Sequence, residues 1–183
     1  MASPSKENQV LTLILESSPL KKWHFEEIMK EAKVTRLVAN KWLKKYLAEK
    51  LIIRVKEKGR FPYYTVESNN PVYYSAKRIY MLERLHSSGL LSRLLSLTGI
   101  KTIILFGSAV RGDWYAGSDI DIFMLGNLPD FDKKIYEQQL HTQIELHVFK
   151  DKREIHAVKT GLIANIINGY VLKGQIQDIV EVA

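Results

Sequence analysis

The sequence of 183 residues predicts an α+β protein, and three features of the chain support this fold class. Apolar residues first recur with the period of a helix, in short segments that end near residue 50. The period then changes to that of strands around a glycine-containing turn within residues 52–66. After a helical segment, two further stretches, 101–106 and 118–125, have the composition of strands.

Composition excludes several classes of protein. Apolar residues make up 46% of the chain and charged residues 26%, a globular balance that excludes disordered and collagen-like chains. Cysteine is absent, which excludes disulfide frameworks, thiolate zinc sites and cysteine nucleophiles. No apolar run approaches the roughly 18 residues of a membrane span, and residues 10–15 are too short for a secretory signal. We therefore expect a soluble, cytoplasmic protein without a membrane partner.

Three helices are predicted before residue 51. The first covers residues 8–16 and the second, which is short, covers residues 24–32. Thr35 is a suitable cap for a third helix that ends near Lys50. The expected buried stripe of this helix consists of Val38, Trp42, Leu43 and Leu47.

A basic hairpin follows these helices. Residues 52–55 and 61–66 read as two strands, and residues 1–70 together contain 14 basic and 8 acidic side chains. Three short helices and a basic hairpin resemble the winged-helix variant of the helix-turn-helix family over about a third of the chain. The resemblance implies that the third helix enters the major groove of DNA and that the hairpin touches the backbone or minor groove.

Basic and polar side chains supply the expected DNA contacts. Arginine and lysine neutralise phosphates, and asparagine pairs bidentately with adenine. The expected DNA-binding residues are Arg36, Asn40, Lys41, Lys44 and Lys45 in the third helix and Lys58 and Arg60 in the hairpin turn. A wing-shaped module for protein contact or dimerisation would present the same pattern, so the sequence leaves DNA binding and a homodimer both open.

The segment after the hairpin is expected to connect two domains. Turn-forming residues gather at 68–71, which marks a boundary. Residues 71–99 carry tyrosines and leucines at helical spacing, and we expect these to pack between domains or in a dimer. The predicted organisation is a domain over 1–70, a helical connector over 71–99 and a second domain over 100–183.

The second domain contains the residues that are suited to bind phosphate groups and a metal ion. The strand 101–106 ends at Gly107-Ser108; Gly107 and Gly112 have the outer spacing of a P-loop, but the Lys-Ser or Lys-Thr that should follow is missing. Asp119 and Asp121 alternate ahead of an apolar run, which places both carboxylates on one strand face. Paired carboxylates repel unless a cation or water separates them, and magnesium suits such a site. The Gly-Ser turn offers N–H groups and a hydroxyl for phosphate oxygens.

These residues carry a second resemblance. The segments Leu105-Phe106-Gly107-Ser108, Arg111-Gly112 and Ser118-Asp119-Ile120-Asp121-Ile122 resemble the signature of the DNA polymerase beta-like nucleotidyltransferase superfamily, above all its minimal branch. In that signature, ten residues separate Gly-Ser from Asp-x-Asp, as they do here. The resemblance covers about residues 100–175. It implies a small mixed sheet flanked by helices, with residues 162–174 as a helix and extended piece that cover the sheet.

The resemblance also implies roles for individual residues. The nucleoside triphosphate, with ATP the expected donor, would be bound by Gly107, Ser108, Arg111 and Ser118, although Arg111 is equally suited to pair with Asp113. Two magnesium ions would be held by Asp119, Asp121 and a third acid from a neighbouring strand. Glu145 is the only carboxylate in the strand expected over 141–149, and we therefore assign it the third position. The family more often has aspartate at the third position, so Glu145 departs from its pattern.

Several other polar residues near these acids are expected to be structural. His147 shares a strand face with Glu145 and is expected to be solvated or packed, with substrate contact the less favoured alternative. Asp130, Asp132 and Glu137 are expected to be surface charges.

The leading functional interpretation is a magnesium-dependent nucleotidyltransferase that carries a DNA-binding winged helix. It would move a nucleoside monophosphate from a triphosphate to a hydroxyl of a protein or nucleic acid, with Asp119, Asp121 and Glu145 as catalytic residues. Members of the minimal branch pair with small helical proteins in toxin–antitoxin modules, so the resemblance implies such a partner. The alternatives are a silent transcriptional regulator that senses nucleotide or binds a partner, and an adaptor that binds neither nucleotide nor DNA.

Overall fold

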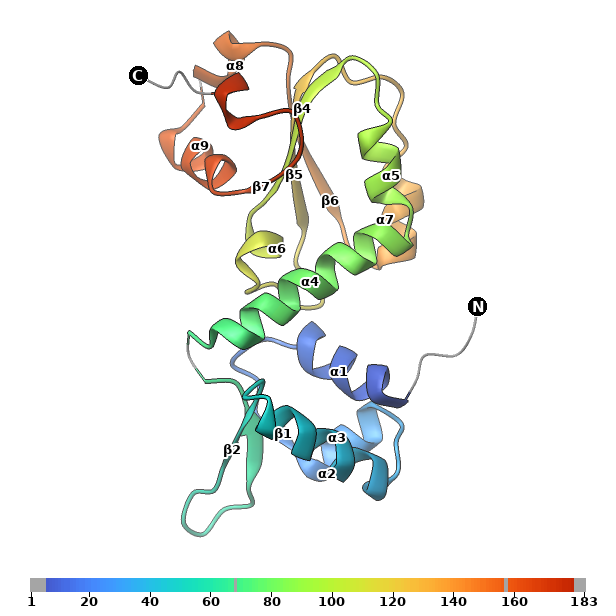
Figure 1. Ribbon diagram of the computed structural model, residues 1–183, viewed down its shortest axis with the longest axis vertical. Helices are drawn as coiled ribbons and strands as arrows, with labels where there is room; N and C mark the ends of the chain where they lie inside the picture. The colour runs from blue at the N-terminus through green and yellow to red at the C-terminus, as the bar shows by residue number, and fades with distance from the viewer. Residues whose placement is uncertain (1–5, 68, 157, 180–183) are drawn as a thin grey trace. The chain divides into compact units, whose positions relative to one another are not determined.

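The computed structural model describes residues 6–67, 69–156 and 158–179, which form two compact units (Figure 1). The first unit runs to Lys77 and includes Asp113–Ala116, and the second comprises the remaining described residues. The boundary between them falls inside helix α4 (Pro71–Ser87). Among the described residues, no helix combines the length and the apolar composition that crossing a membrane would require.

The first unit consists of three helices and a small antiparallel sheet. Its elements are α1 (Lys6–Glu16), β1 (Trp23–His24), α2 (Phe25–Glu31), α3 (Arg36–Ala48), β2 (Ile53–Val55) and β3 (Tyr63–Thr65). The strand order is β1-β3-β2, and Arg54 lies opposite Tyr64 in the hairpin. The three helices and the hairpin confirm the expectation from hydrophobic periodicity. The two-residue strand β1 was not expected, because it is too short to show a period.

The buried stripe of α3 differs from the expected one. Ala39, Leu43 and Tyr46 are buried, whereas Val38, Trp42 and Leu47 are half-buried on its flanks. Spacings of four and three residues place the buried three on one helix face. Tyr46 can be buried because its hydroxyl donates to the Glu7 carbonyl at 3.3 Å. The expectation is confirmed for Leu43 and wrong for the other three residues, because it favoured large apolar residues over a small alanine and a tyrosine with a satisfied hydroxyl.

A buried lysine joins Asp113–Ala116 to the rest of the first unit. The side chain of Lys77 is fully buried, and its ammonium donates to the carbonyls of Ser17, at 3.2 Å, and Trp114. The Ala116 N–H donates to the Glu16 carbonyl at 2.8 Å. Burial lowers the pKa of Lys77 to about 8. The segment that precedes Gly117 is therefore anchored by hydrogen bonds at Trp114 and at Ala116.

The second unit is built on a mixed four-stranded sheet. Its strands are β4 (Ile100–Phe106), β5 (Ile120–Gly126), β6 (Ile144–Phe149) and β7 (Tyr170–Lys173), in the order β6-β5-β4-β7. β5 pairs parallel with β6, whereas β4 pairs antiparallel with β5 and β7. Besides the end of α4, the helices are α5 (Leu90–Leu95), α6 (Ser108–Arg111), α7 (Lys134–Leu140), α8 (Lys152–His156), α9 (Thr160–Ile167) and the 3-10 helix η1 (Ile176–Asp178).

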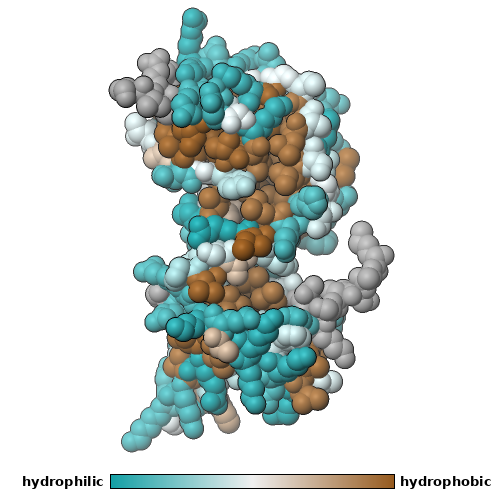
Figure 2. All heavy atoms as spheres, in the orientation of Figure 1, coloured by the Kyte–Doolittle hydropathy of each residue, from teal (hydrophilic) through white to brown (hydrophobic). Residues whose placement is uncertain are grey.

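This unit confirms the mixed sheet flanked by helices. Ile104, Phe106, Phe123 and Leu125 form one core with Ile155 of α8 and Ile166 of α9. In Figure 1, α8 and α9 lie on one side of the sheet and α5 lies on the other. Figure 2 shows hydrophobic residues at the surface around α9, whereas hydrophilic residues dominate the visible face of the first unit near α3 and the hairpin.

Candidate functional site

Gly107 ends β4 beside Asp121 of β5. Phe106 is paired with Asp121 in the antiparallel ladder, and the next residue, Gly107, has a φ of 72°. A Cβ on Gly107 would lie 2.1 Å from Oδ2 of Asp121, so any other residue here would force the carboxylate to move. Glycine is therefore favoured here by the positive φ, and its lack of a side chain leaves the carboxylate of Asp121 in place.

Asp121 and Glu145 are neighbours on parallel strands. The ladder of β5 and β6 pairs Asp121 with Glu145, so both side chains project from the same face of the sheet. Burial raises the pKa of Asp121, and the negative charge of Glu145 raises it further. Glu145 is more open to solvent, with 59% of its side chain exposed. Two carboxylates held this close repel each other and favour a cation between them.

The imidazole of His147 lies close to both of these carboxylates. It follows Glu145 by two residues, and its Nε2 lies 3.7 Å from an Asp121 oxygen and 3.6 Å from a Glu145 oxygen. Phe106 packs against the imidazole, with ring centroids 5.1 Å apart. Asp121, Glu145 and His147 each place one ligand atom within 4.8 Å of the others, as a metal site requires. The alternation along β6 placed His147 on the correct face, but only the strand register shows that it meets Asp121.

Asp119 lies at the edge of this cluster. β5 begins at Ile120, so Asp119 precedes the strand instead of belonging to it, and its side chain is exposed. It lines a groove of about 360 Å³ together with Glu145 and Lys133. Its charge also contributes to the raised pKa of Asp121. The structure thus brings the three expected acids to one region, with Asp121 and Glu145 in the tighter group and Asp119 at the groove.

The remaining residues expected to bind nucleotide lie around the same strand ends. Ser108 is the first residue of α6 and is half-buried, and Arg111, in the last turn of that helix, is exposed. Ser118 is half-buried in the segment that leads to Asp119. A second groove of about 650 Å³ begins at Asp119 and is bordered by residues of α7, among them Lys134 and Gln138.

The acids expected to be surface charges divide into two groups. Asp130 and Asp132 are exposed, as expected. Glu137 is half-buried and has a structural role: its carboxylate accepts the Ile144 N–H at 2.9 Å and pairs with Lys133 at 3.1 Å. These contacts, led by the Ile144 hydrogen bond, lower the pKa of Glu137. Glu137 therefore fixes the start of β6 at Ile144, and Glu145 is the next residue of this strand, with His147 two residues further on.

The residues expected to contact DNA are exposed, but some have acidic neighbours. All five of the expected residues on α3 are exposed: Arg36, Asn40, Lys41, Lys44 and Lys45. Arg36 pairs with Glu26, and Lys45 pairs with Glu7 at 2.7 Å. Lys45 also lies 3.8 Å from Glu49, which caps the C-terminus of α3. The hydrophobic pattern revealed the exposed face of α3, whereas the partners Glu26 and Glu7 come from other helices and could not be read from that pattern.

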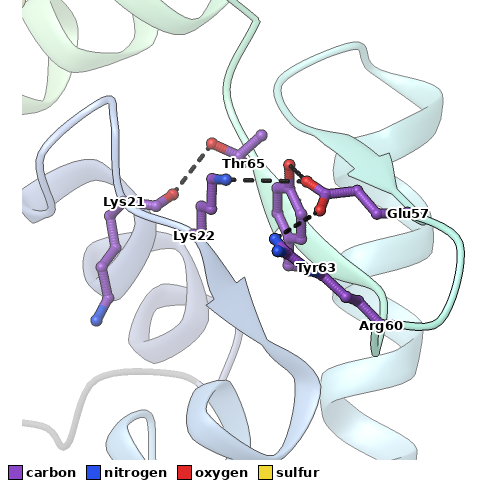
Figure 3. Close-up of polar contacts among 6 residues, drawn as sticks. All are labelled: Lys21, Lys22, Glu57, Arg60, Tyr63 and Thr65. Carbon is purple, nitrogen blue, oxygen red and sulfur yellow. Dashed lines mark hydrogen bonds and ion pairs between the residues drawn. The ribbon is translucent and has the colours of Figure 1, made fainter.

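The hairpin shows the same mixture of exposure and pairing. Lys58 is exposed, and Arg60 pairs with Glu57 at 2.8 Å. Glu57 also accepts a hydrogen bond from the Tyr63 hydroxyl at 3.1 Å, as Figure 3 shows. A groove of about 550 Å³ runs between the helices and the hairpin, and it includes two residues that sequence reasoning missed, Arg54 and the 85% exposed Phe61.

Comparisons with known proteins identify the family. The family model for the nucleotidyltransferase domain matches residues 87–181, which is more than half of the chain. No curated protein matches the chain. Among solved structures, a toxin-antitoxin with AMP-PNP is 21% identical, with a TM-score of 0.34 over 55% of this chain and 76% of that one. A mutant of the toxin-antitoxin MntA-HpeT is 18% identical, with a TM-score of 0.31 over 55% and 75% of the two chains. From the match of the family model, the chain belongs to the nucleotidyltransferase domain family.

Proposed function

We propose that the second unit transfers a nucleoside monophosphate from a nucleoside triphosphate, with ATP as the expected donor, to a hydroxyl group of a protein or nucleic acid. Membership of the nucleotidyltransferase domain family supports nucleotide transfer in general. The observation that carries the more specific proposal is the register of Asp121 and Glu145 on adjacent strands, directly beside Gly107.

The residues at this place fit the divalent cations that such a transfer uses. Asp121 and Glu145 offer hard oxygen ligands at short range, and Asp119 faces the groove that Glu145 also lines. We propose these three acids as ligands of two magnesium ions. Ions held there would lower the pKa of the attacking hydroxyl and neutralise the oxygens of the pyrophosphate, which leaves as the bond between the α- and β-phosphates breaks.

The chain's own residues have three further tasks in this proposal. Gly107 leaves the space that Asp121 occupies, which keeps the carboxylate at the end of β4. Ser108, Arg111 and Ser118 hold the phosphate oxygens through hydroxyl and guanidinium groups. Glu145 is exposed at the groove, and it accepts the proton that the acceptor hydroxyl gives up.

For the first unit, we propose a winged-helix domain over residues 1–70 that binds duplex DNA. Lys41 and Lys44 of α3 and Lys58 of the hairpin are exposed. The groove between α3 and the hairpin is lined by Asn40 and Arg54 and by none of these lysines. Lysines at such positions neutralise phosphates without reading the sequence. Arg36, Lys45 and Arg60 already have acidic neighbours, so their phosphate contacts require an exchange of partners.

The proposed transfer is tested with ATP labelled at the α-phosphate. The protein is purified from its source cells with any partner that accompanies it, and label on protein or nucleic acid is followed in the presence of magnesium. Asp121→Asn should reduce labelling by at least about 100-fold, because one carboxylate of the pair is lost. Asp130→Asn, an exposed acid of the same unit, should have no effect. Labelling by Asp121→Asn at the wild-type rate would contradict the proposal.

The same assay separates the transferase from a regulator that only senses nucleotide. Wild-type protein that binds triphosphate but labels neither protein nor nucleic acid would favour the regulator. Protein that binds neither triphosphate nor duplex DNA would favour the adaptor.

A further inference from the structure

One nitrogen atom in the Asp121 cluster has no hydrogen-bond partner. Nε2 of His147 is inaccessible to solvent, and no atom of residues 6–67, 69–156 and 158–179 forms a hydrogen bond with it, although two carboxylates lie within the range of an ion pair with a protonated imidazole. The carboxylate oxygens of Asp121 and Glu145 lie 3.7 and 3.6 Å away, beyond a good hydrogen bond. Buried polar atoms in folded proteins almost always have a partner, so this nitrogen requires an explanation.

The orientation of His147 is fixed by its surroundings. It lies opposite Phe123 in the ladder of β5 and β6, and its ring packs against Phe106 of β4. Glu145 precedes it by two residues, so the two side chains share a face of β6. Three strands of one sheet thus place the imidazole nitrogen between two carboxylates, and 19% of the His147 side chain remains exposed.

The three donor atoms are of two chemical kinds. Asp121 and Glu145 supply hard oxygens, whereas a neutral imidazole supplies a softer nitrogen. Magnesium strongly prefers oxygen and water ligands. Manganese accepts carboxylates and water and also lies in the transition-metal series in which imidazole is a common ligand. A mixed set with ligand atoms within 4.8 Å of one another therefore fits a manganese-like ion better than magnesium.

We propose that His147 is a nitrogen ligand of the divalent cation held by Asp121 and Glu145, and that this ligand makes the site favour Mn²⁺ over Mg²⁺. The proposal rests on the proposed function, because it concerns the cation site of the same unit. It assigns His147 a direct contact with the cation, which explains why its Nε2 is directed at two acids without a hydrogen bond to either.

The test uses the full chain, Mn²⁺ alone and no nucleotide, so that no base nitrogen can reach the ion. Mn²⁺ binding is measured by titration of the free-ion electron paramagnetic resonance signal. Pulsed electron paramagnetic resonance of the bound ion then detects a coupled ¹⁴N nucleus. We expect this coupling in the wild type, and its replacement by a ¹⁵N coupling when only histidine is labelled with ¹⁵N.

Two variants assign the coupling to a residue. His147→Gln should lose the nitrogen coupling and weaken Mn²⁺ binding by about tenfold or more, while Mg²⁺ binding changes less. His86→Gln, an exposed histidine in α4, is the matched control and should retain both coupling and affinity. Should His147→Gln fail to fold, the isotope shift in the wild type still decides whether histidine is a ligand.

The outcomes separate this inference from the proposed function. Bound Mn²⁺ without nitrogen coupling in the wild type would overturn the role of His147 and leave the carboxylate site intact. An equal loss of Mn²⁺ and Mg²⁺ affinity in His147→Gln, with no coupling in the wild type, would reduce His147 to a packing residue. If neither ion binds the wild type, or if Asp121→Asn binds both as tightly, the proposed function itself fails.

Discussion

Gly107 faces the carboxylate of Asp121 so closely that a Cβ at position 107 would lie 2.1 Å from Oδ2. The first half of the Gly-Ser turn thus positions an acid, in addition to any contact that the turn makes with phosphate. This relationship joins the end of β4 to the start of β5, which are 14 residues apart in the sequence but paired in the sheet.

Gly107→Ala should therefore damage the site. The substitution must displace Asp121 and place a non-glycine residue at a φ of 72°, so we expect at least about a 100-fold loss of nucleotide transfer. We also expect destabilisation of about 1–3 kcal/mol, measured by urea unfolding. Gly161→Ala is the matched control, because its Cβ meets no atom within 4 Å. Full activity of Gly107→Ala would show that the position of Asp121 does not matter.

Lys77 should make the stability of the protein rise with pH. Burial lowers its pKa to about 8, whereas the unfolded chain has the ordinary value of 10.5. Between these values the unfolded state binds more protons, so the free energy of unfolding increases with pH, by up to about 3 kcal/mol. Urea unfolding at pH 7.5, 9 and 10 measures this slope. In Lys77→Met the contribution should disappear; an unchanged slope would mean that Lys77 does not titrate in this range.

Asp178 should contribute stability that is lost in acid. Its carboxylate pairs with Lys101 and accepts the Thr102 hydroxyl, each at 2.6 Å, and the Lys101 contact is the main reason that its pKa falls to about 2. The stabilisation is complete above the unfolded value of 3.8 and disappears as pH falls toward 2. Asp178→Asn should lower the free energy of unfolding at pH 7 by about 1–2 kcal/mol. The difference between the variant and the wild type should shrink steadily as pH falls from 4 to below 2; a difference that does not shrink would contradict this role.

Duplex binding should depend steeply on salt and respond to the charges on α3. Lys44→Ala should weaken binding and reduce the salt slope by about one. Glu26→Gln should strengthen binding several-fold at low salt, because Arg36 loses its acidic partner. Fluorescence anisotropy over a salt series measures both effects, with Glu83→Gln in α4 as the control. If the anisotropy of a labelled duplex is the same with and without the protein at low salt, the first unit does not bind DNA and remains a surface for protein contact.

Hydrophobic periodicity predicted the three helices and the hairpin of the first unit and the strands β4, β5 and β6 of the second, because their apolar residues recur at a regular spacing. It gave no sign of the short helices α6 and α8. It did not predict β1, which has two residues, or the burial of Ala39 and Tyr46. It also missed the position of Trp114, which is buried in the first unit although it follows α6 of the second. These features depend on contacts between segments distant in the sequence.

The candidate site was predictable to a similar extent. The Gly-Ser and Asp-x-Asp spacing identified Gly107, Asp119 and Asp121, and alternation along β6 placed Glu145 and His147 on one face. Their meeting depends on the parallel register of β5 and β6, which no local pattern specifies. The same register explains why His147, expected to be solvated or packed, has its Nε2 beside two acids.

The most direct test of the proposed transferase is the rate of magnesium-dependent transfer of labelled AMP by Glu145→Gln, Asp121→Asn and the double variant. If both acids serve one cation site, each single substitution should reduce the rate by at least about 100-fold. The double variant should then be scarcely worse than either, since residues that act as a unit are not additive. Wild-type rates in Glu145→Gln would contradict the assignment of the third acid and, with it, the proposed site.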